Sequence, residues 1–232
     1  MGDVQRQPRE VFITGATGYL GRDLVPILAL RGHRVRALVR PGSEWKVPPG
    51  CTMVKADPLI GELFRDAIHP GDTFIQLVGT PKPAPWKGRQ FLEVDLASAR
   101  ESVMMAAEVG VAHFIYVSVA QPAPVMKSYI AVRQEVERMI RASGLPATIL
   151  RPWYVVGPFH RWPLLFSPVY RLLERLPETR ETARRLALVT LPQMHAALVA
   201  AVEDPATELR IVDVAAIRAT PLPPELLSSP AR

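Results

Sequence analysis

A glycine-rich stretch near the N-terminus, VFITGATGYLGR at residues 11–22, constrains the fold more than any other part of the chain. Gly15, Gly18 and Gly21 lie between an apolar segment typical of a buried strand and a segment with helical spacing. In that context the first glycine permits a tight turn, the second lets the backbone approach a pyrophosphate, and the third permits close packing of helix on strand. The stretch therefore predicts a dinucleotide-binding loop, with phosphates held at the helix N-terminus. A plain glycine turn is the alternative, because the spacing is G-x-x-G-x-x-G rather than G-x-G-x-x-G.

The rest of the chain alternates short apolar segments with segments of helical spacing. Strands are predicted at residues 10–14, 34–39, 52–55, 73–78, 113–117 and 148–150. Helices are predicted at residues 19–30, 59–68, 90–109 and 129–142. This order predicts an α/β fold, in which a doubly wound parallel sheet of Rossmann type carries helices on both faces.

Length and composition fit one such domain over residues 1–232. Hydrophobic residues make up 48% of the chain and charged residues 22%, as in a globular core. We expect a small C-terminal helical cap at about 153–190 and a loosely held, Pro- and Ser-rich tail at 220–232. An aromatic group in the cap either lines a substrate pocket or forms a local core, and it comprises Trp153, Tyr154, Phe159, Trp162, Phe166 and Tyr170.

Several classes of protein do not fit the sequence. The single cysteine, Cys51, allows no intramolecular disulfide, and we expect it in the core. The N-terminus lacks a leader-like stretch and no apolar run is long enough to span a bilayer, which predicts a cytoplasmic protein. His160 and His195 have no partners at metal-ligand spacing, so no metal site is expected. The net charge of +6 suits a solvated basic surface or an anionic ligand, and the absence of a groove-reading element argues against nucleic acid.

The end of the second predicted strand bears on the choice of cofactor. An acidic residue there would accept hydrogen bonds from the ribose 2′-hydroxyl of NAD. Here the strand ends in Val39-Arg40-Pro41, and no carboxylate occurs before Glu44. A guanidinium suits the 2′-phosphate of NADP, so we predict NADP, with NAD as the alternative. Arg40 as one more exposed arginine is the other interpretation.

Several segments together resemble the atypical branch of the short-chain dehydrogenase/reductase superfamily, related to NmrA-like proteins and to the nucleotide-binding accessory subunit of respiratory complex I. The segments are TGATGYLG at 14–21, RALVR at 36–40, KADP at 55–58, HFIYVSV at 113–119, RQEVERMIRASGLPATILRP at 133–152 and VVGP at 155–158. The resemblance runs from residue 11 to about residue 215, in the order that the family has.

The resemblance implies which residues contact the cofactor. Asp57, followed by Pro58, corresponds to a contact with the adenine region. Residues 77–79 would pass along the ribose, and residues 152–155 would lie beside the nicotinamide. With the glycine loop and Arg40, the expected cofactor-binding residues are Gly15, Thr17, Gly18, Tyr19, Leu20, Gly21, Arg40, Asp57, Pro58, Leu77, Val78, Gly79, Pro152 and Val155.

The resemblance also implies a catalytic tyrosine, although the match is weaker here. Family enzymes use a tyrosine as proton donor to a carbonyl, a lysine four residues later and a serine after the fifth strand. Tyr129 stands in the tyrosine place, but Arg133 replaces the lysine. Arginine can bond ribose hydroxyls and stabilise a tyrosinate, yet it cannot relay a proton. Val119 occupies the serine place, so Ser118, one residue earlier, either lines the site or caps the strand.

Two functions from different classes remain open. The first is an NADP-dependent oxidoreductase that reduces a small, apolar carbonyl or related substrate, with Tyr129, Arg133 and Ser118 as candidate catalytic residues. The second is a non-catalytic dinucleotide-binding protein, such as a redox sensor or an assembly or regulatory partner, which the departures at Arg133 and Val119 favour. The position of Tyr129 relative to the nicotinamide separates the two.

Overall fold

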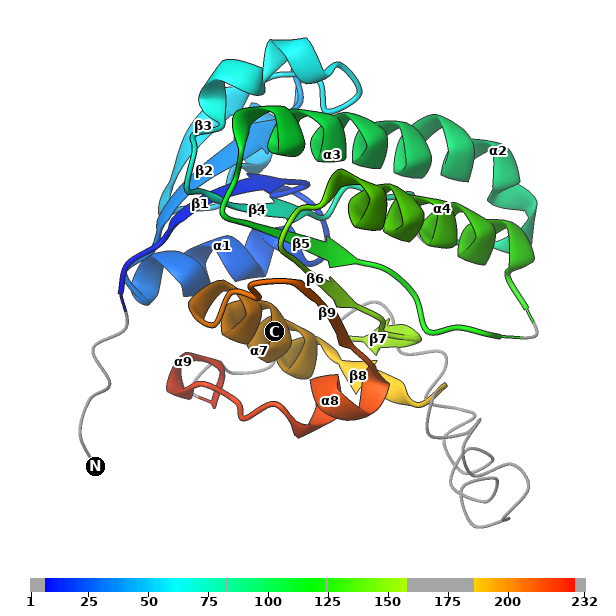
Figure 1. The fold of residues 1–232 in the computed structure, drawn as a ribbon. Helices are drawn as coiled ribbons and strands as arrows, with labels where there is room; N and C mark the ends of the chain where they lie inside the picture. Colours follow the sequence, from blue (N-terminus) through cyan, green and yellow to red (C-terminus); the bar gives the residue numbers. More distant parts are fainter. Residues whose placement is uncertain (1–6, 82, 124, 158–185, 228–232) are drawn as a thin grey trace.

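A twisted parallel sheet forms the centre of the protein in the computed structural model, which describes residues 7–81, 83–123, 125–157 and 186–227 (Figure 1). Within these residues seven parallel strands pair in the order β3-β2-β1-β4-β5-β6-β9. They are β1 (Glu10–Thr14), β2 (Arg34–Val39), β3 (Cys51–Lys55), β4 (Thr73–Gln76), β5 (His113–Val117), β6 (Ala147–Leu150) and β9 (Leu209–Val212). Two short strands, β7 (Tyr154–Val156) and β8 (Leu188–Thr190), pair separately. The predicted doubly wound α/β fold is confirmed.

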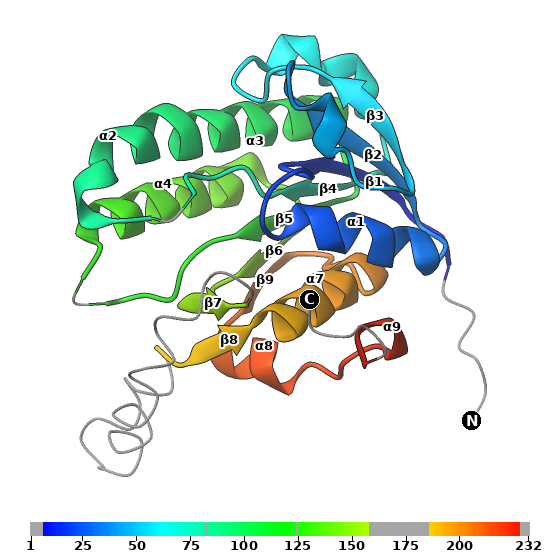
Figure 2. The same ribbon diagram turned by 180° about the vertical axis from the view of Figure 1, so that it is seen from behind.

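Helices cover both faces of the sheet (Figures 1 and 2). One face carries α3 (Ala97–Val109) and α4 (Lys127–Ser143), and the other carries α1 (Gly21–Leu30) and α7 (Leu191–Glu203). Shorter helices are α2 (Gly88–Gln90), α8 (Val214–Ala219) and α9 (Pro224–Leu227). None of the helices that the structure describes has the length and apolar character to cross a membrane.

The core is divided by the sheet into two hydrophobic clusters, and β1 contributes to both. Val11 and Ile13 pack with α1 and α7, whereas Phe12 packs with residues of α3 and α4 on the opposite face. Because successive side chains point to opposite faces, a strand covered on both sides is apolar throughout. This packing fixes the carboxyl ends of β1, β4, β5 and β6 at one edge, where ligands bind in such folds.

The prediction of a helix at residues 59–68 is wrong. Two short 3₁₀ turns occupy the segment, η2 (Gly61–Leu63) and η3 (Arg65–Ala67). The apolar spacing misleads because Leu63 is 58% exposed, so the spacing marks no continuous buried face. Instead the Gly61 N–H donates to the Glu101 carboxylate of α3 at 3.0 Å, which fixes the turn against that helix.

The helix predicted at residues 90–109 exists but contains a wider turn. After α2, residues Phe91–Leu96 form a π-helical segment, η5, which continues into α3. Such turns widen the backbone by one residue and are frequent at functional sites. Here the turn places Phe91 and Asp95 in the interior, both 0% exposed.

The C-terminal part of the chain is more structured than the sequence predicts. Within the tail predicted at 220–232, Pro224–Leu227 form α9, and Glu225 pairs with Arg31, the residue that follows α1, at 2.7 Å. The elements α7, β9 and α8 have no counterpart among the predicted strands and helices. Most of the predicted cap falls in 158–185, outside the described residues, as do His160 and four of its aromatic residues, Phe159, Trp162, Phe166 and Tyr170.

His113 in β5 makes folding stability sensitive to pH. Burial lowers the pKa of this imidazole from 6.5 to about 4, and Arg210 and Arg9 act in the same direction. Between these two values the unfolded chain binds a proton that the folded chain does not, so stability falls as pH falls. Linkage predicts a loss of about 2 kcal/mol in the free energy of unfolding between neutral pH and about pH 5.

Urea unfolding at both pH values measures that loss. The His113→Asn variant should lack the part due to His113, while His33 and His195, whose pKa values burial also lowers, act equally in both proteins. An identical pH dependence in wild type and variant would contradict the assignment.

Candidate active site

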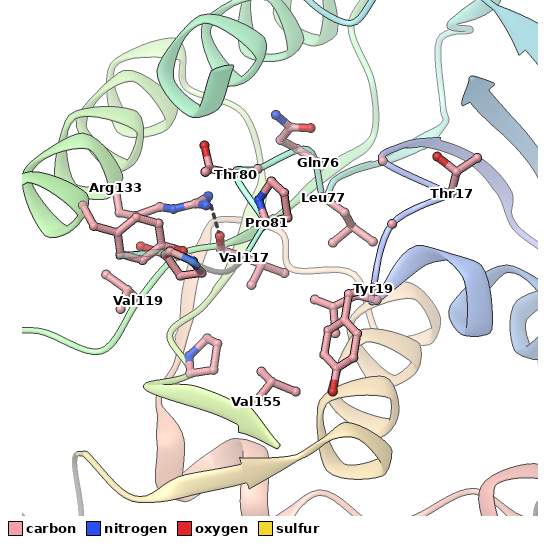
Figure 3. Close-up of a pocket in the computed structure, with 18 of the residues that line it drawn as sticks. Thr17, Tyr19, Gln76, Leu77, Thr80, Pro81, Val117, Val119, Arg133 and Val155 are labelled. Carbon is pink, nitrogen blue, oxygen red and sulfur yellow. Dashed lines mark hydrogen bonds between the residues drawn. The ribbon is translucent and has the colours of Figure 1, made fainter. Parts of the chain in front are cut away.

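A cavity of about 540 Å³ opens at the carboxyl ends of the parallel strands. It is bounded by the glycine loop after β1, the ends of β2 and β4, and the segments after β5 and β6 (Figure 3). The sheet order changes direction between β1 and β4, which is the point where doubly wound folds bind ligands. Most residues expected from the sequence line this cavity: Gly15, Thr17, Gly18, Tyr19, Leu20, Arg40, Leu77, Gly79, Ser118, Tyr129, Arg133, Pro152 and Val155.

The three glycines of the loop have different physical roles. Gly15 has φ +76°, and a Cβ there would lie 2.7 Å from the carbonyl carbon of Leu77. A Cβ at Gly21 would lie 2.4 Å from the Gly15 oxygen. The fold itself therefore requires glycine at both positions. At Gly18 the nearest described atom to a Cβ would be the Gly15 oxygen at 3.1 Å, so this face of the loop is left for a ligand.

The start of α1 beside the loop fits a phosphate group. No described side chain caps the helix, whose N-cap residue is Leu20. Uncapped N–H groups and the positive end of the helix dipole together favour an anion. The loop thus offers what the pyrophosphate of a dinucleotide requires.

The end of the cavity beside β2 is cationic. Arg40, Ser43 and Lys46 line it, and the sequence predicts only the first of these. Glu44, the first carboxylate after β2, pairs with Lys55 at 2.6 Å, and this contact lowers the pKa of Glu44. Lys46 lies over the Trp45 ring at 4.7 Å. Two cations, Arg40 and Lys46, therefore line the cavity, whereas the nearby carboxylate of Glu44 is paired with Lys55.

Four expected residues are not among the described residues that line the cavity, namely Gly21, Asp57, Pro58 and Val78. Gly21 acts in packing, as above. Asp57 accepts a hydrogen bond from the Leu59 N–H at 3.0 Å, which closes a turn after β3. Contact between these four residues and a cofactor stays a prediction.

Gln76 at the end of β4 is a cavity residue that the sequence does not predict. Its side chain is 1% exposed. It accepts hydrogen bonds from the Thr14 hydroxyl and, at 3.2 Å, from the Val78 N–H, and it donates to Ser98 at 3.2 Å. A polar residue inside the apolar run TFIQLV is the signal that could have identified it. Gln76 thus joins the last residue of β1, before the glycine loop, to the segment after β4, part of which lines the cavity.

Tyr129 and Arg133 lie one turn apart on α4 and both line the cavity. The guanidinium of Arg133 is buried and donates to Asp95 at 2.6 Å, to the Tyr116 hydroxyl at 3.0 Å and to the Val117 carbonyl at 3.1 Å. Its central carbon lies 4.8 Å from the centre of the Tyr129 ring. Burial acts to lower the pKa of Arg133, but Tyr116, Tyr129 and Asp95 outweigh it and raise the pKa. The residue is a permanent cation.

Ser118 lines the cavity, but its hydroxyl donates a hydrogen bond to a neighbouring side chain rather than into the cavity. The hydroxyl donates to Glu137 of α4 at 2.6 Å. The same carboxylate accepts from Arg151 at 2.9 Å and from Gln121 at 3.0 Å. Val119, the next residue, is 3% exposed and also lines the cavity.

Sequence comparisons match this chain to one family and to several relatives. The model of the NmrA-like family matches residues 7–217. A ceramide reductase of Caulobacter vibrioides is 30% identical over 213 residues, which cover 90% of this chain and 65% of that protein. A 3-beta-hydroxysteroid dehydrogenase of Mycolicibacterium neoaurum is 30% identical over 112 residues, which cover 46% and 31%. The chain thus spans less than two thirds of the length of these relatives.

Solved structures share the fold at low sequence identity. The enzyme WbmH of Bordetella bronchiseptica, in complex with NAD+, has a TM-score of 0.66 and 21% identity, covering 88% of this chain and 75% of that one. A UDP-glucuronic acid 4-epimerase from Bacillus cereus, in complex with NAD, has a TM-score of 0.62 and 15% identity, covering 88% and 77%. At these identities the likeness establishes the fold alone.

Proposed function

Because the chain belongs to the NmrA-like family, whose model matches residues 7–217, we propose that it binds NADP(H) and reduces a small, apolar carbonyl substrate. One observation carries the proposal. A single cavity is lined by the glycine loop at Gly18, by cations at Arg40 and Lys46, and by the hydroxyl-bearing Tyr129. The family and the fold support a nicotinamide dinucleotide, and the cations favour its 2′-phosphorylated form.

The chemistry divides between the cofactor and this chain. When bound, NADPH supplies a hydride to the carbonyl carbon. Tyr129 donates its phenolic proton to the carbonyl oxygen as negative charge develops there. Arg133 holds a fixed positive charge beside the Tyr129 ring but keeps its own protons, so protons that return to Tyr129 come from another source.

Apolar side chains that line the cavity bear on the substrate class. They come from the segment after β4, the end of β5 and the residues that follow it, and the segment after β6 that includes β7; they are Pro81, Pro83, Val117, Val119, Trp153 and Val155. Such a wall favours a substrate that buries hydrocarbon. Two relatives are named for ceramide and for a 3-beta-hydroxysteroid, which is in keeping with an apolar substrate.

A non-catalytic dinucleotide-binding protein is the second candidate, and two contacts favour it. The Arg133 guanidinium is engaged by Asp95, and the Ser118 hydroxyl is directed to Glu137. Both groups are thereby turned to neighbours within the protein. NADPH oxidation measured with a panel of apolar aldehydes and ketones tests the enzyme directly. Turnover supports the reductase, whereas binding without turnover supports the second candidate.

Cofactor preference gives a further prediction. The protein should bind NADPH more tightly than NADH, and Arg40→Ala should weaken NADPH binding by about tenfold or more, because a charge-assisted hydrogen bond contributes about 1.5–3 kcal/mol. NADH binding should change little. Calorimetric titration of both cofactors measures the two affinities.

Arg138→Ala is the matched control, because this exposed arginine of α4 pairs with Glu135 and does not line the cavity. It removes the same charge and should leave both affinities unchanged. Equal affinity of the wild type for NADPH and NADH would refute NADP preference.

A further inference from the structure

Two facing segments of the protein carry interlocking pairs of side chains with the same spacing. On α4, Tyr129 and Arg133 are four residues apart and face the cavity. On η5, Phe91 and Asp95 are also four residues apart and both are fully buried. In the ribbon the two segments lie side by side (Figures 1 and 2). Each residue of the candidate catalytic pair therefore has its own partner on the neighbouring segment.

The first contact joins two aromatic rings. Phe91 and Tyr129 meet edge to face, with ring centres 5.0 Å apart. This geometry is favoured by the ring quadrupoles and adds to the energy of burial. Because Phe91 is fully buried and Tyr129 only half-buried, the phenylalanine is the fixed member. It limits how far the Tyr129 ring can turn.

The second contact is a buried ion pair. One oxygen of Asp95 accepts from Arg133 at 2.6 Å, and the other accepts from the N–H and hydroxyl of Thr80 at 2.8 and 2.6 Å. The carboxylate is thus satisfied on both sides, as a buried charge requires. Thr80 itself lines the cavity. Asp95 therefore ties the loop after β4 to the arginine of α4.

The four-residue spacing explains how each segment makes two contacts. In η5 both Phe91 and Asp95 are buried in the interior. On an α-helix, residues four apart also share a face, which is the case for Tyr129 and Arg133 on α4. Two segments that run side by side with this common spacing can pair residue by residue.

We propose that Phe91 and Asp95 are positioning residues that hold Tyr129 and Arg133 as one unit in the cavity wall. Neither acts on the substrate directly. Phe91 fixes the ring of Tyr129, and Asp95 fixes the guanidinium that packs on the same ring. The inference rests on the proposed function only in taking Tyr129 as the proton donor.

A fluorine label on the tyrosines tests the positioning without any turnover. The chain has five tyrosines, so protein made with fluorotyrosine should give five resonances, and Tyr129→Phe identifies one of them. We expect Asp95→Asn to shift the Tyr129 resonance in the wild-type background. In an Arg133→Met background the same substitution should shift it by less than half as much, because Asp95 acts through the guanidinium. Phe91→Leu, which keeps both charges of the ion pair, should also shift it.

Asp72→Asn is the matched control. Asp72 is a buried carboxylate, 1% exposed, that pairs with Arg36 away from the cavity. Its loss perturbs the protein in the same way but should leave the Tyr129 resonance in place. If Asp95→Asn alone fails to fold, two other measurements decide the question. The first compares the Tyr129 resonance of Arg133→Met with that of the double variant that carries both Arg133→Met and Asp95→Asn. The second is the Tyr129 resonance of Phe91→Leu.

Turnover gives the second measurement. Phe91→Leu and Asp95→Asn should lower kcat by about tenfold or more while the Kd for NADPH stays within about twofold, and Asp72→Asn should change neither. The positioning role is overturned if Asp95→Asn leaves the Tyr129 resonance unshifted. It is also overturned if Asp95→Asn shifts that resonance as much in the Arg133→Met background as in the wild-type background. A wild type without turnover overturns the proposed function instead, and the fluorine measurements still decide the positioning.

Discussion

Gly18→Val should weaken dinucleotide binding by about a hundredfold or more, equal to roughly 3 kcal/mol, while the free energy of unfolding falls less than after substitution of Gly15 or Gly21. The reason is local geometry. A Cβ at Gly18 meets the Gly15 oxygen at 3.1 Å and otherwise extends into the space beside the loop, where a pyrophosphate would lie. The two methyl groups of valine would fill that space.

The neighbouring glycines provide the contrast. Gly21→Ala would put a Cβ 2.4 Å from the Gly15 oxygen, and Gly15→Ala would put one 2.7 Å from the Leu77 backbone at a positive φ. Both should lower the free energy of unfolding, because backbone atoms must move. Calorimetric titration with NADPH and NADH, together with urea unfolding, separates the two classes of effect.

Gly88→Ala is the control, because its Cβ would have ordinary contacts at 3.8 Å and the residue does not line the cavity. It should preserve both binding and stability. If Gly18→Val bound dinucleotide normally, the loop would have to be a plain glycine turn.

Tyr129→Phe should reduce turnover by about 10² to 10⁴, the usual contribution of a general acid, and should leave NADPH affinity unchanged. The substitution removes one oxygen and keeps the ring that packs on Phe91 at 5.0 Å and on the Arg133 guanidinium at 4.8 Å. Rapid-mixing measurements of NADPH oxidation with an apolar carbonyl compare the two proteins, and titration gives the affinity.

A second hydroxyl supplies the comparison. Tyr116→Phe removes a fully buried phenol oxygen that accepts from Arg133 and does not line the cavity. This change should cost stability, because the guanidinium loses an acceptor, and it should cost far less turnover than Tyr129→Phe. Unchanged turnover in Tyr129→Phe would remove this residue from the mechanism.

The parts of the fold that the sequence predicts are those specified locally. Strands β1 and β5 each contain an apolar run, VFI and FIYV, and the glycine loop has its turn residues within a few positions of one another. Tyr129 and Arg133 follow from their spacing on one helix. In each case neighbouring residues contain the information, so no distant contact has to be known.

The remaining features depend on contacts between distant residues. The π turn at Phe91–Leu96 cannot be distinguished from an α-helix by its apolar spacing. From the sequence alone Asp95 resembles a surface residue, because its partner Arg133 is 38 positions later in the chain. Helix α7 is buried at nine positions between Leu191 and Val202 and has no polar face, so periodicity gives no sign of it.

The Arg133 contacts also bear on how this chain can change by mutation. Its guanidinium bonds Asp95, Tyr116 and Val117 at the same time. A lysine would bring one compact ammonium in place of a planar fork and leave part of that set without a donor. The effect of Arg133→Lys should therefore depend on the residues at positions 95 and 116. A lysine at position 133 would satisfy its surroundings only if the residues that contact the guanidinium changed with it.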